Sequence, residues 1–173
     1  MVTLRQATLA DLSQLLWLEE SCFSTDRISS ASFRRLLSRS TAALWVAEAT
    51  LAPSNVEEAS CVSDRIVGYF LLFFRSRSFF ARLYSLAVAP DCLGQGIGGR
   101  LLGQADSVAL ERHAKVMRLE VRADNLSARE LYKKRGYTLV TPLIAYYQDG
   151  CDGWRLEKKL FSTDLKVFYP VKE

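Results

Sequence analysis

Histidine is nearly absent from this sequence, and cysteine is scarce and scattered. The 173 residues contain one histidine, His113, and four cysteines that form no CxxC pair. A zinc site needs closely spaced Cys and His ligands, so we expect no metal. A Ser-His or Cys-His catalytic pair needs a histidine beside its nucleophile, and a single histidine leaves little room for one. Unpaired cysteines also fit a reduced compartment better than a disulfide framework.

Long apolar runs and dense basic blocks are missing as well. No stretch reaches the roughly 18 apolar residues of a membrane span, and the first residues lack the apolar core of a signal peptide. We therefore expect a cytoplasmic protein with no membrane partner. The net charge of +4 suits an anionic small molecule or an acidic partner. Lys and Arg are too dispersed to predict a nucleic-acid partner.

What the chain has is an ordinary globular composition with mixed strand and helix patterns. Hydrophobic residues make up 49% and charged residues 24%, as in folded domains with a substantial core. With no internal repeat and no linker, residues 1–173 are expected to form a single α/β domain. Strands are predicted at 3–7, 43–49, 65–75, 81–89, 116–123, 137–147 and 153–161, helices at 11–23, 29–39, 97–113 and 127–135, and a polar loop at 53–64.

The segment LAVAPDCLGQGIGGRLL, residues 86–102, ends an apolar strand at a proline and then becomes rich in glycine. Four of the six residues at 94–99 are glycines, and a helix follows directly. Such a loop lets successive backbone N–H groups approach an anion, and the helix adds its partly positive N-terminus. Arg100, in the first turn, could add a formal charge. A glycine-rich turn without any ligand remains an alternative.

The same glycines can be read as a dinucleotide-binding fingerprint. Gly94-x-Gly96-x-x-Gly99 has the required spacing, and Glu120 lies about where a ribose-binding acid would fall. Against this, four residues from Pro90 onward separate the strand from the first glycine, whereas the fingerprint should begin at the end of the strand. Four predicted strands precede the motif, and only about fifty residues follow the strand at 116–123. These features disfavour a nicotinamide cofactor.

Over essentially its whole length, and strongly from residue 81 to residue 159, the sequence resembles the GNAT superfamily of acetyl-CoA-dependent N-acetyltransferases. LAVAPDCLGQGIGGRLL resembles its pyrophosphate-binding motif, and LEVRADNLSARELYKKRGY resembles the segment that follows. With YYQDGCDGWRLEK included, the likeness is closest to RimI-type enzymes that acetylate proteins and peptides. It implies a GNAT fold, with a mixed, largely antiparallel sheet of about seven strands flanked by about four helices. It also implies acetyl-CoA as co-substrate and a primary-amine acceptor, expected to be a protein N-terminus. The oligomeric state, monomer or homodimer, remains open.

The glycine segment departs from the family pattern at one position. The family has Gln or Arg three residues before the first glycine of its Gly-x-Gly/Ala pair, and here that position is Leu93. The backbone cradle does not depend on this side chain, but one polar contact is lost, so weaker or altered cofactor binding is possible. The resemblance assigns cofactor contacts to Leu86, Ala87, Val88, Gly94, Gln95, Gly96, Ile97, Gly98, Gly99, Arg100, Asn125 and Tyr132.

Two residues twelve positions apart match the catalytic pair of the family. Glu120 lies on the polar face of the alternating strand at 116–123, near Arg118 and Arg122. The resemblance makes Glu120 the general base and Tyr132 the general acid that protonates the CoA sulfur. A phenol, with a usual pKa of about 10, suits that task. From the residues alone, Glu120 fits a solvated strand face equally well, and Tyr132 fits a helix core stripe.

The remaining site residues have a structural and a functional interpretation each. Asn125 fits a helix N-cap or a turn, while Ser127 and Glu130 have the spacing of a capping box. The resemblance makes Asn125 a contact to the pantetheine or phosphate arm, and both roles can coexist. If Tyr146 and Tyr147 simply end a strand, they need no functional role. The resemblance places them in the groove that binds the acceptor peptide.

Two other functions stay open at this point. An acetyltransferase for a polyamine, an amino acid or an aminoglycoside would tend to have an acidic site. Asp149, Asp152 and the pair Glu57-Glu58 could supply such charge. A GNAT fold that binds acetyl-CoA without turnover is the other alternative. The intact pair of Glu120 and Tyr132 argues against it.

Overall fold

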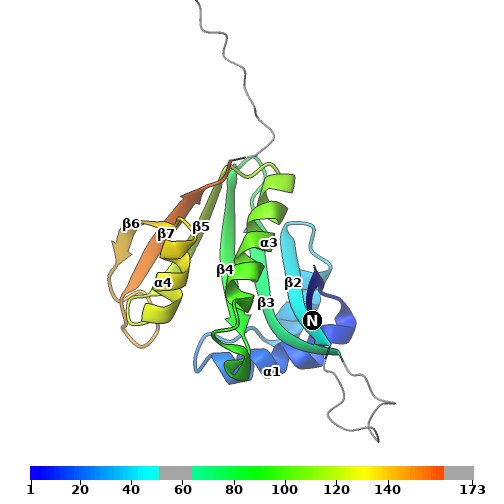
Figure 1. Ribbon diagram of the computed structural model, residues 1–173. Coiled ribbons are helices and arrows are strands. Elements are labelled where there is room, and N and C mark those ends of the chain that lie inside the picture. The colour runs from blue at the N-terminus through cyan, green and yellow to red at the C-terminus, as the bar shows by residue number, and fades with distance from the viewer. Residues whose placement is uncertain (51–63, 162–173) are drawn as a thin grey trace, which may run out of the picture.

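Seven strands form one mixed sheet with helices on both faces. The computed structural model describes residues 1–50 and 64–161. The strand order is β1-β2-β3-β4-β5-β7-β6 (Figure 1), and β4 and β5 are the parallel pair among otherwise antiparallel neighbours. The strands are β1 Val2–Gln6, β2 Ala42–Thr50, β3 Asp64–Phe74, β4 Phe80–Val88, β5 Val116–Arg122, β6 Thr138–Leu143 and β7 Gly153–Lys159, and the helices are α1 Leu12–Cys22, α2 Ser30–Leu37, α3 Ile97–Glu111 and α4 Leu126–Lys134. This confirms the predicted architecture, while the loop expected at 53–64 lies outside the described residues except for Asp64.

The helices cover the sheet in pairs because the central strand β3 is apolar and buried on both of its faces. Side chains of α1 and α2 join one core on one face, and those of α3 and α4 join a second core on the other (Figure 1). The predicted helical stripe is buried as expected in α3. Its members are Ile97, Leu101, Ala105 and Val108. The alternation predicted for β5 is also confirmed, with Met117, Leu119 and Val121 buried.

Beta strands β4 and β5 are paired over only part of their length. Their pairing ends at Leu83 and Leu119, although β4 continues to Val88 and β5 to Arg122. A register shift against β3 leaves Tyr84 of β4 without a partner, which makes it a bulge. A bulge bends its strand, and beyond this point β4 and β5 separate (Figure 1). The predicted functional residues of both strands lie at this separation.

Two local predictions were wrong. The strand predicted at 137–147 ends at Leu143, because Ala145 has a φ of +47°, which no strand accommodates. Tyr146 and Tyr147 therefore lie in the loop between β6 and β7. Helix α4 begins at Leu126 with Asn125 as its N-cap, so the capping box expected further along does not form. No helix within residues 1–50 and 64–161 is long and apolar enough to cross a membrane.

Candidate active site

Glu120 lies where β4 and β5 begin to separate. Its neighbours Leu119 and Val121 point into the core under α3 and α4, so its carboxylate faces the side of the sheet that carries α1 and α2. One carboxylate oxygen accepts a hydrogen bond from Arg82 Nε at 2.9 Å, and the other accepts one from Arg155 Nε at 3.1 Å. Only 7% of the Glu120 side chain is exposed. The carboxylate is thus held in one orientation by two guanidinium groups.

The arginines that hold Glu120 come from other strands, and the sequence analysis did not find them. Arg82 projects from β4, and Arg155 stands directly opposite Glu120 in β7. The arginines nearest in sequence bind elsewhere, since Arg118 pairs with Glu157 at 2.5 Å and Arg122 pairs with acidic residues of two loops. The alternation of GWRLEKK was the available signal for Arg155, because it places that side chain on the polar face.

The two tyrosines of the β6–β7 loop lie beside Glu120. Arg82 also donates a hydrogen bond to the Tyr146 hydroxyl at 3.4 Å. The rings of Tyr146 and Tyr147 meet edge to face at 5.2 Å, and both pack against Gly153, where a Cβ would lie 3.2–3.3 Å from them. Burial, together with the charges of Tyr146 and Glu120, raises the pKa of Tyr147 to about 12. Tyr147 is therefore protonated at neutral pH.

Tyr132 approaches the same region from the other face of the sheet. It is buried in α4 and packs edge to face on Tyr137 with ring centroids 5.6 Å apart. Burial, with a smaller contribution from Tyr147, raises the pKa of Tyr132 well above its usual value. A buried phenol in this state is protonated at neutral pH and is therefore present as a hydrogen-bond donor.

The glycine segment forms an open cradle at the start of α3. Gly94 and Gly96 both have φ of +77°, a conformation that glycine adopts without strain. Gly96 is the N-cap of α3, and no described side chain caps this helix. Its first-turn N–H groups, from Ile97 to Gly99, are therefore available to an anion. A Cβ at Gly98 would lie 3.1 Å from Leu131, so the cradle packs closely against α4.

The other predicted cofactor residues differ in how their side chains are engaged. Arg100 donates to the Val2 carbonyl at 2.6 Å, and Asn125 accepts from the Ala128 N–H as the cap of α4. Gln95 donates to the Asp91 carbonyl at 3.4 Å, and the Leu93 side chain is exposed. The stretch Leu86, Ala87 and Val88 pairs with β3 on one edge and faces the separation from β5 on the other. Their contacts to a cofactor stay predictions.

Comparison with known proteins links this geometry to one family. The model of the acetyltransferase (GNAT) family matches residues 9–137. An uncharacterised N-acetyltransferase of Methanocaldococcus jannaschii is 34% identical over 99 residues, which cover 57% of this chain and 62% of the relative. The thialysine N-epsilon-acetyltransferase of Bos taurus is 35% identical over 94 residues, covering 53% of this chain and 52% of the relative. This chain thus spans between half and two thirds of the length of these relatives.

Solved structures share the fold over nearly the whole chain. The ribosomal-protein-S18-alanine N-acetyltransferase of Escherichia coli superposes with a TM-score of 0.75 at 20% identity. The match covers 98% of this chain and 100% of that chain. At this identity the likeness concerns the fold alone. It confirms the predicted arrangement of the sheet and its flanking helices.

Proposed function

We propose, from the premise that this chain belongs to the acetyltransferase (GNAT) family, that it acetylates the N-terminal amine of a protein or peptide. Members of this family are N-acetyltransferases that take the acetyl group from acetyl-CoA. The observation that carries the proposal is the position of Glu120. It is a nearly buried carboxylate at the separation of β4 and β5, with the tyrosines of an exposed loop beside it.

The residues of the cradle fit the anionic arm of acetyl-CoA. Gly94 and Gly96 hold left-handed backbone conformations, and the uncapped start of α3 offers N–H groups that a pyrophosphate can accept from. The unpaired edge of β4 at 86–88 would hold an extended arm through backbone groups. Leu93 can add only apolar contact, so we infer that the backbone provides most of the anion binding here.

In the proposed mechanism Glu120 acts as the base and Tyr132 as the acid. Acetyl-CoA supplies a thioester carbonyl, at which a C–N bond forms and the C–S bond breaks. Glu120 accepts a proton from the attacking amine, directly or through one water, while Arg82 and Arg155 keep its carboxylate oriented. Tyr132 then donates its phenolic proton to the departing sulfur and regains one from solvent, while Glu120 releases to solvent the proton that it accepted from the amine. Because the amine attacks the thioester directly, the reaction requires no covalent enzyme intermediate.

A small-molecule amine is the second candidate acceptor, because the Bos taurus relative is named for thialysine. The acidic groups that could hold a polycation are already engaged where the structure describes them. Asp149 pairs with Arg122 at 2.9 Å, and Asp152 accepts from the Ala145 N–H at 2.8 Å. The pair Glu57-Glu58 lies outside the described residues. These contacts favour a peptide over a polyamine.

The test is acetyl transfer to matched acceptors. A peptide with a free N-terminus is compared with the same peptide formylated at its N-terminus, and with thialysine and spermidine. We expect CoA release only with the free N-terminus, and mass spectrometry should locate the acetyl group on the α-amine. Transfer to the small amines alone would contradict the proposal. Saturable acetyl-CoA binding with no transfer to any acceptor would instead support a binding module.

A further inference from the structure

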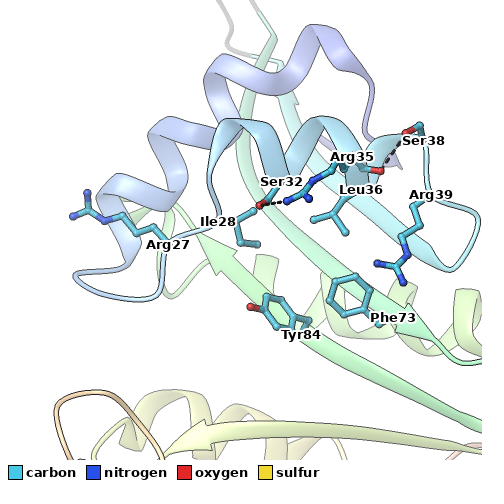
Figure 2. Close-up of a pocket in the computed structure, with 9 residues that line it drawn as sticks. All are labelled: Arg27, Ile28, Ser32, Arg35, Leu36, Ser38, Arg39, Phe73 and Tyr84. Carbon is cyan, nitrogen blue, oxygen red and sulfur yellow. Dashed lines mark hydrogen bonds between the residues drawn. The ribbon is translucent and has the colours of Figure 1, made fainter.

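A groove beside the candidate active site is lined by three arginines, and we call it the arginine groove. Arg27, Arg35 and Arg39 border a cavity of about 550 Å³ between the α1–α2 region and the sheet (Figure 2). Phe73 of β3 and Tyr84 of β4 form its floor, with their rings edge to face at 5.1 Å. The groove therefore combines an aromatic floor with a cationic rim.

The three guanidinium groups have no acidic partner among residues 1–50 and 64–161. Arg27 donates to the Phe23 carbonyl, Arg35 to the Ser32 hydroxyl and Arg39 to the Thr41 hydroxyl, all of them neutral oxygens. Arginines that pair with carboxylates lie elsewhere in the fold. None of the residues lining the groove is acidic. Arg35 and Arg39 therefore keep their formal positive charges available to an anion in the groove, while the Arg27 guanidinium at its border points away from them (Figure 2).

Buried hydrogen bonds attach the segment that carries Arg27 and Ile28, at the border of the groove, to the sheet. Glu19 is 2% exposed and accepts a hydrogen bond from the Ile28 N–H at 2.5 Å and another from the Tyr69 hydroxyl. The Tyr69 hydroxyl is also 2.7 Å from the Ser85 hydroxyl in β4. This buried network fixes the segment that carries Arg27 relative to β3 and β4. The charged rim is thus attached to a preorganised scaffold.

Tyr84 connects the groove with the candidate active site. It is the bulge residue of β4, and the Arg82 guanidinium lies 5.5 Å from the centre of its ring. Arg82 in turn binds Glu120. An extended acceptor whose amine reaches Glu120 can therefore continue over Tyr84 into the groove. The groove opens on the face that carries α2, whereas α3 and its cradle cover the opposite face, so the phosphates of the acetyl donor are not its occupant.

We propose that the arginine groove binds acidic side chains of the acceptor peptide, so that the enzyme selects N-termini followed by Asp or Glu. This inference rests on the proposed function, because it places the acetylated amine and the acidic residues on one peptide. The charge of the rim supplies the preference, and the aromatic floor supplies sequence-independent contact with the peptide. Peptides with Lys at the same positions are repelled by the rim.

The experiment compares three peptides with the same N-terminal residue and length, carrying Glu, Gln or Lys at the following positions. Binding of fluorescein-labelled peptide to the CoA-saturated protein is measured by anisotropy, and kcat/KM is measured for transfer. We expect the Glu peptide to exceed the Gln peptide by at least about tenfold in both, as several exposed ion pairs together provide. The advantage should shrink at 0.5 M salt, where such pairs are screened (Debye length about 4 Å).

The variant Arg35→Gln/Arg39→Gln should bring the Glu-to-Gln ratio close to one. Arg34→Gln is compared with Arg35→Gln alone as the matched control for loss of one charge, because Arg34 is exposed on α2 and does not line the groove. Equal binding of the Glu and Gln peptides, or an equal loss in the Arg34 variant, would overturn the inference. Arginine-dependent binding with no acetylation of any peptide would instead contradict the proposed function. The binding measurement therefore tests the arginine groove, and the transfer measurement tests the proposed function.

Discussion

Glu120 receives one charge-assisted hydrogen bond on each carboxylate oxygen, and these bonds affect how the carboxylate can accept a proton. Two such bonds orient the carboxylate strongly. A proton from an amine must then compete with Arg82 or Arg155 for an oxygen lone pair. The Arg82 side chain is 43% exposed and that of Arg155 is 34% exposed, so Arg82 is the one better placed to shift when an acceptor arrives. We therefore regard Arg82 as a positioning residue for the base.

Replacing the proposed base and acid tests this assignment. Glu120→Gln and Tyr132→Phe should each lower kcat by about 10²-fold, the usual contribution of a positioned acid or base. Both substitutions keep the size of the side chain, so the fold should persist, as circular dichroism can verify. For Glu120→Gln, affinity for acetyl-CoA, measured by calorimetric titration, serves as the control and should change little, whereas Tyr132 is itself an expected cofactor contact. Turnover close to that of the parent in both variants would refute the roles.

At the scale of elements, the helices and strands were predictable because their periodicity is local. The stripe of α3 follows from residues three or four positions apart, and the alternation of β5 follows from residues two positions apart. The contact of Glu120 with Arg82 was not predictable, because it depends on the β4–β5 register between residues 38 positions apart in the chain. The end of β6 was missed because a single left-handed residue, Ala145, determines it. Its side chain gives no signal for that conformation.

The buried carboxyl that joins α1 to the sheet gives a prediction on pH. Burial raises the pKa of Glu19, so the folded state favours its protonated form more than the unfolded state does. The stability of the folded state therefore falls as pH rises from the usual Glu pKa, about 4.3, through the raised value. Each tenfold change in proton affinity corresponds to about 1.4 kcal/mol.

Glu19→Gln should remove this pH dependence, with its amide oxygen still accepting from the Ile28 N–H and its amide NH2 group donating to the Tyr69 hydroxyl oxygen. The free energy of unfolding of the variant, relative to the parent, should rise across that pH range and then level off. Urea unfolding of both proteins at intervals from pH 4 to pH 8 measures the difference. Curves that stay parallel over the whole range would show that the Glu19 carboxyl does not titrate differently on folding.

For the whole molecule, two positive regions lie on opposite faces of one sheet. The cradle at the start of α3 suits the phosphates of the acetyl donor, and the arginine groove suits an acidic acceptor. The net charge of +4 attracts both substrates at long range. The two hydrophobic cores share the central strands, since β3 contributes Val67 and Phe70 to one and Ile66 and Tyr69 to the other. We therefore propose that the chain unfolds as one domain, and that binding at either face stabilises all of it.

Linkage between binding and unfolding gives the last prediction. Acetyl-CoA at 100 times its Kd should stabilise the protein by about 2.7 kcal/mol, which raises Tm by about 5–10 °C for a chain of this size. NADH at the same concentration should leave Tm unchanged. Gly96→Ala should lower the Tm of the unliganded protein, since an L side chain at φ of +77° costs about 1–2 kcal/mol. It should also lose much of the shift that acetyl-CoA produces.

Gly150→Ala is the matched control, because Gly150 has a φ of +79° and a Cβ there would meet nothing within 4 Å, as at Gly96. It should lower the unliganded Tm by a similar amount and keep the full acetyl-CoA shift, because the β6–β7 loop lies outside the cradle. Differential scanning fluorimetry measures all three proteins. If Gly96→Ala kept the full shift, the phosphates would be held elsewhere and the cradle would be only a turn. If NADH raised Tm and acetyl-CoA did not, the glycine segment would hold a dinucleotide after all.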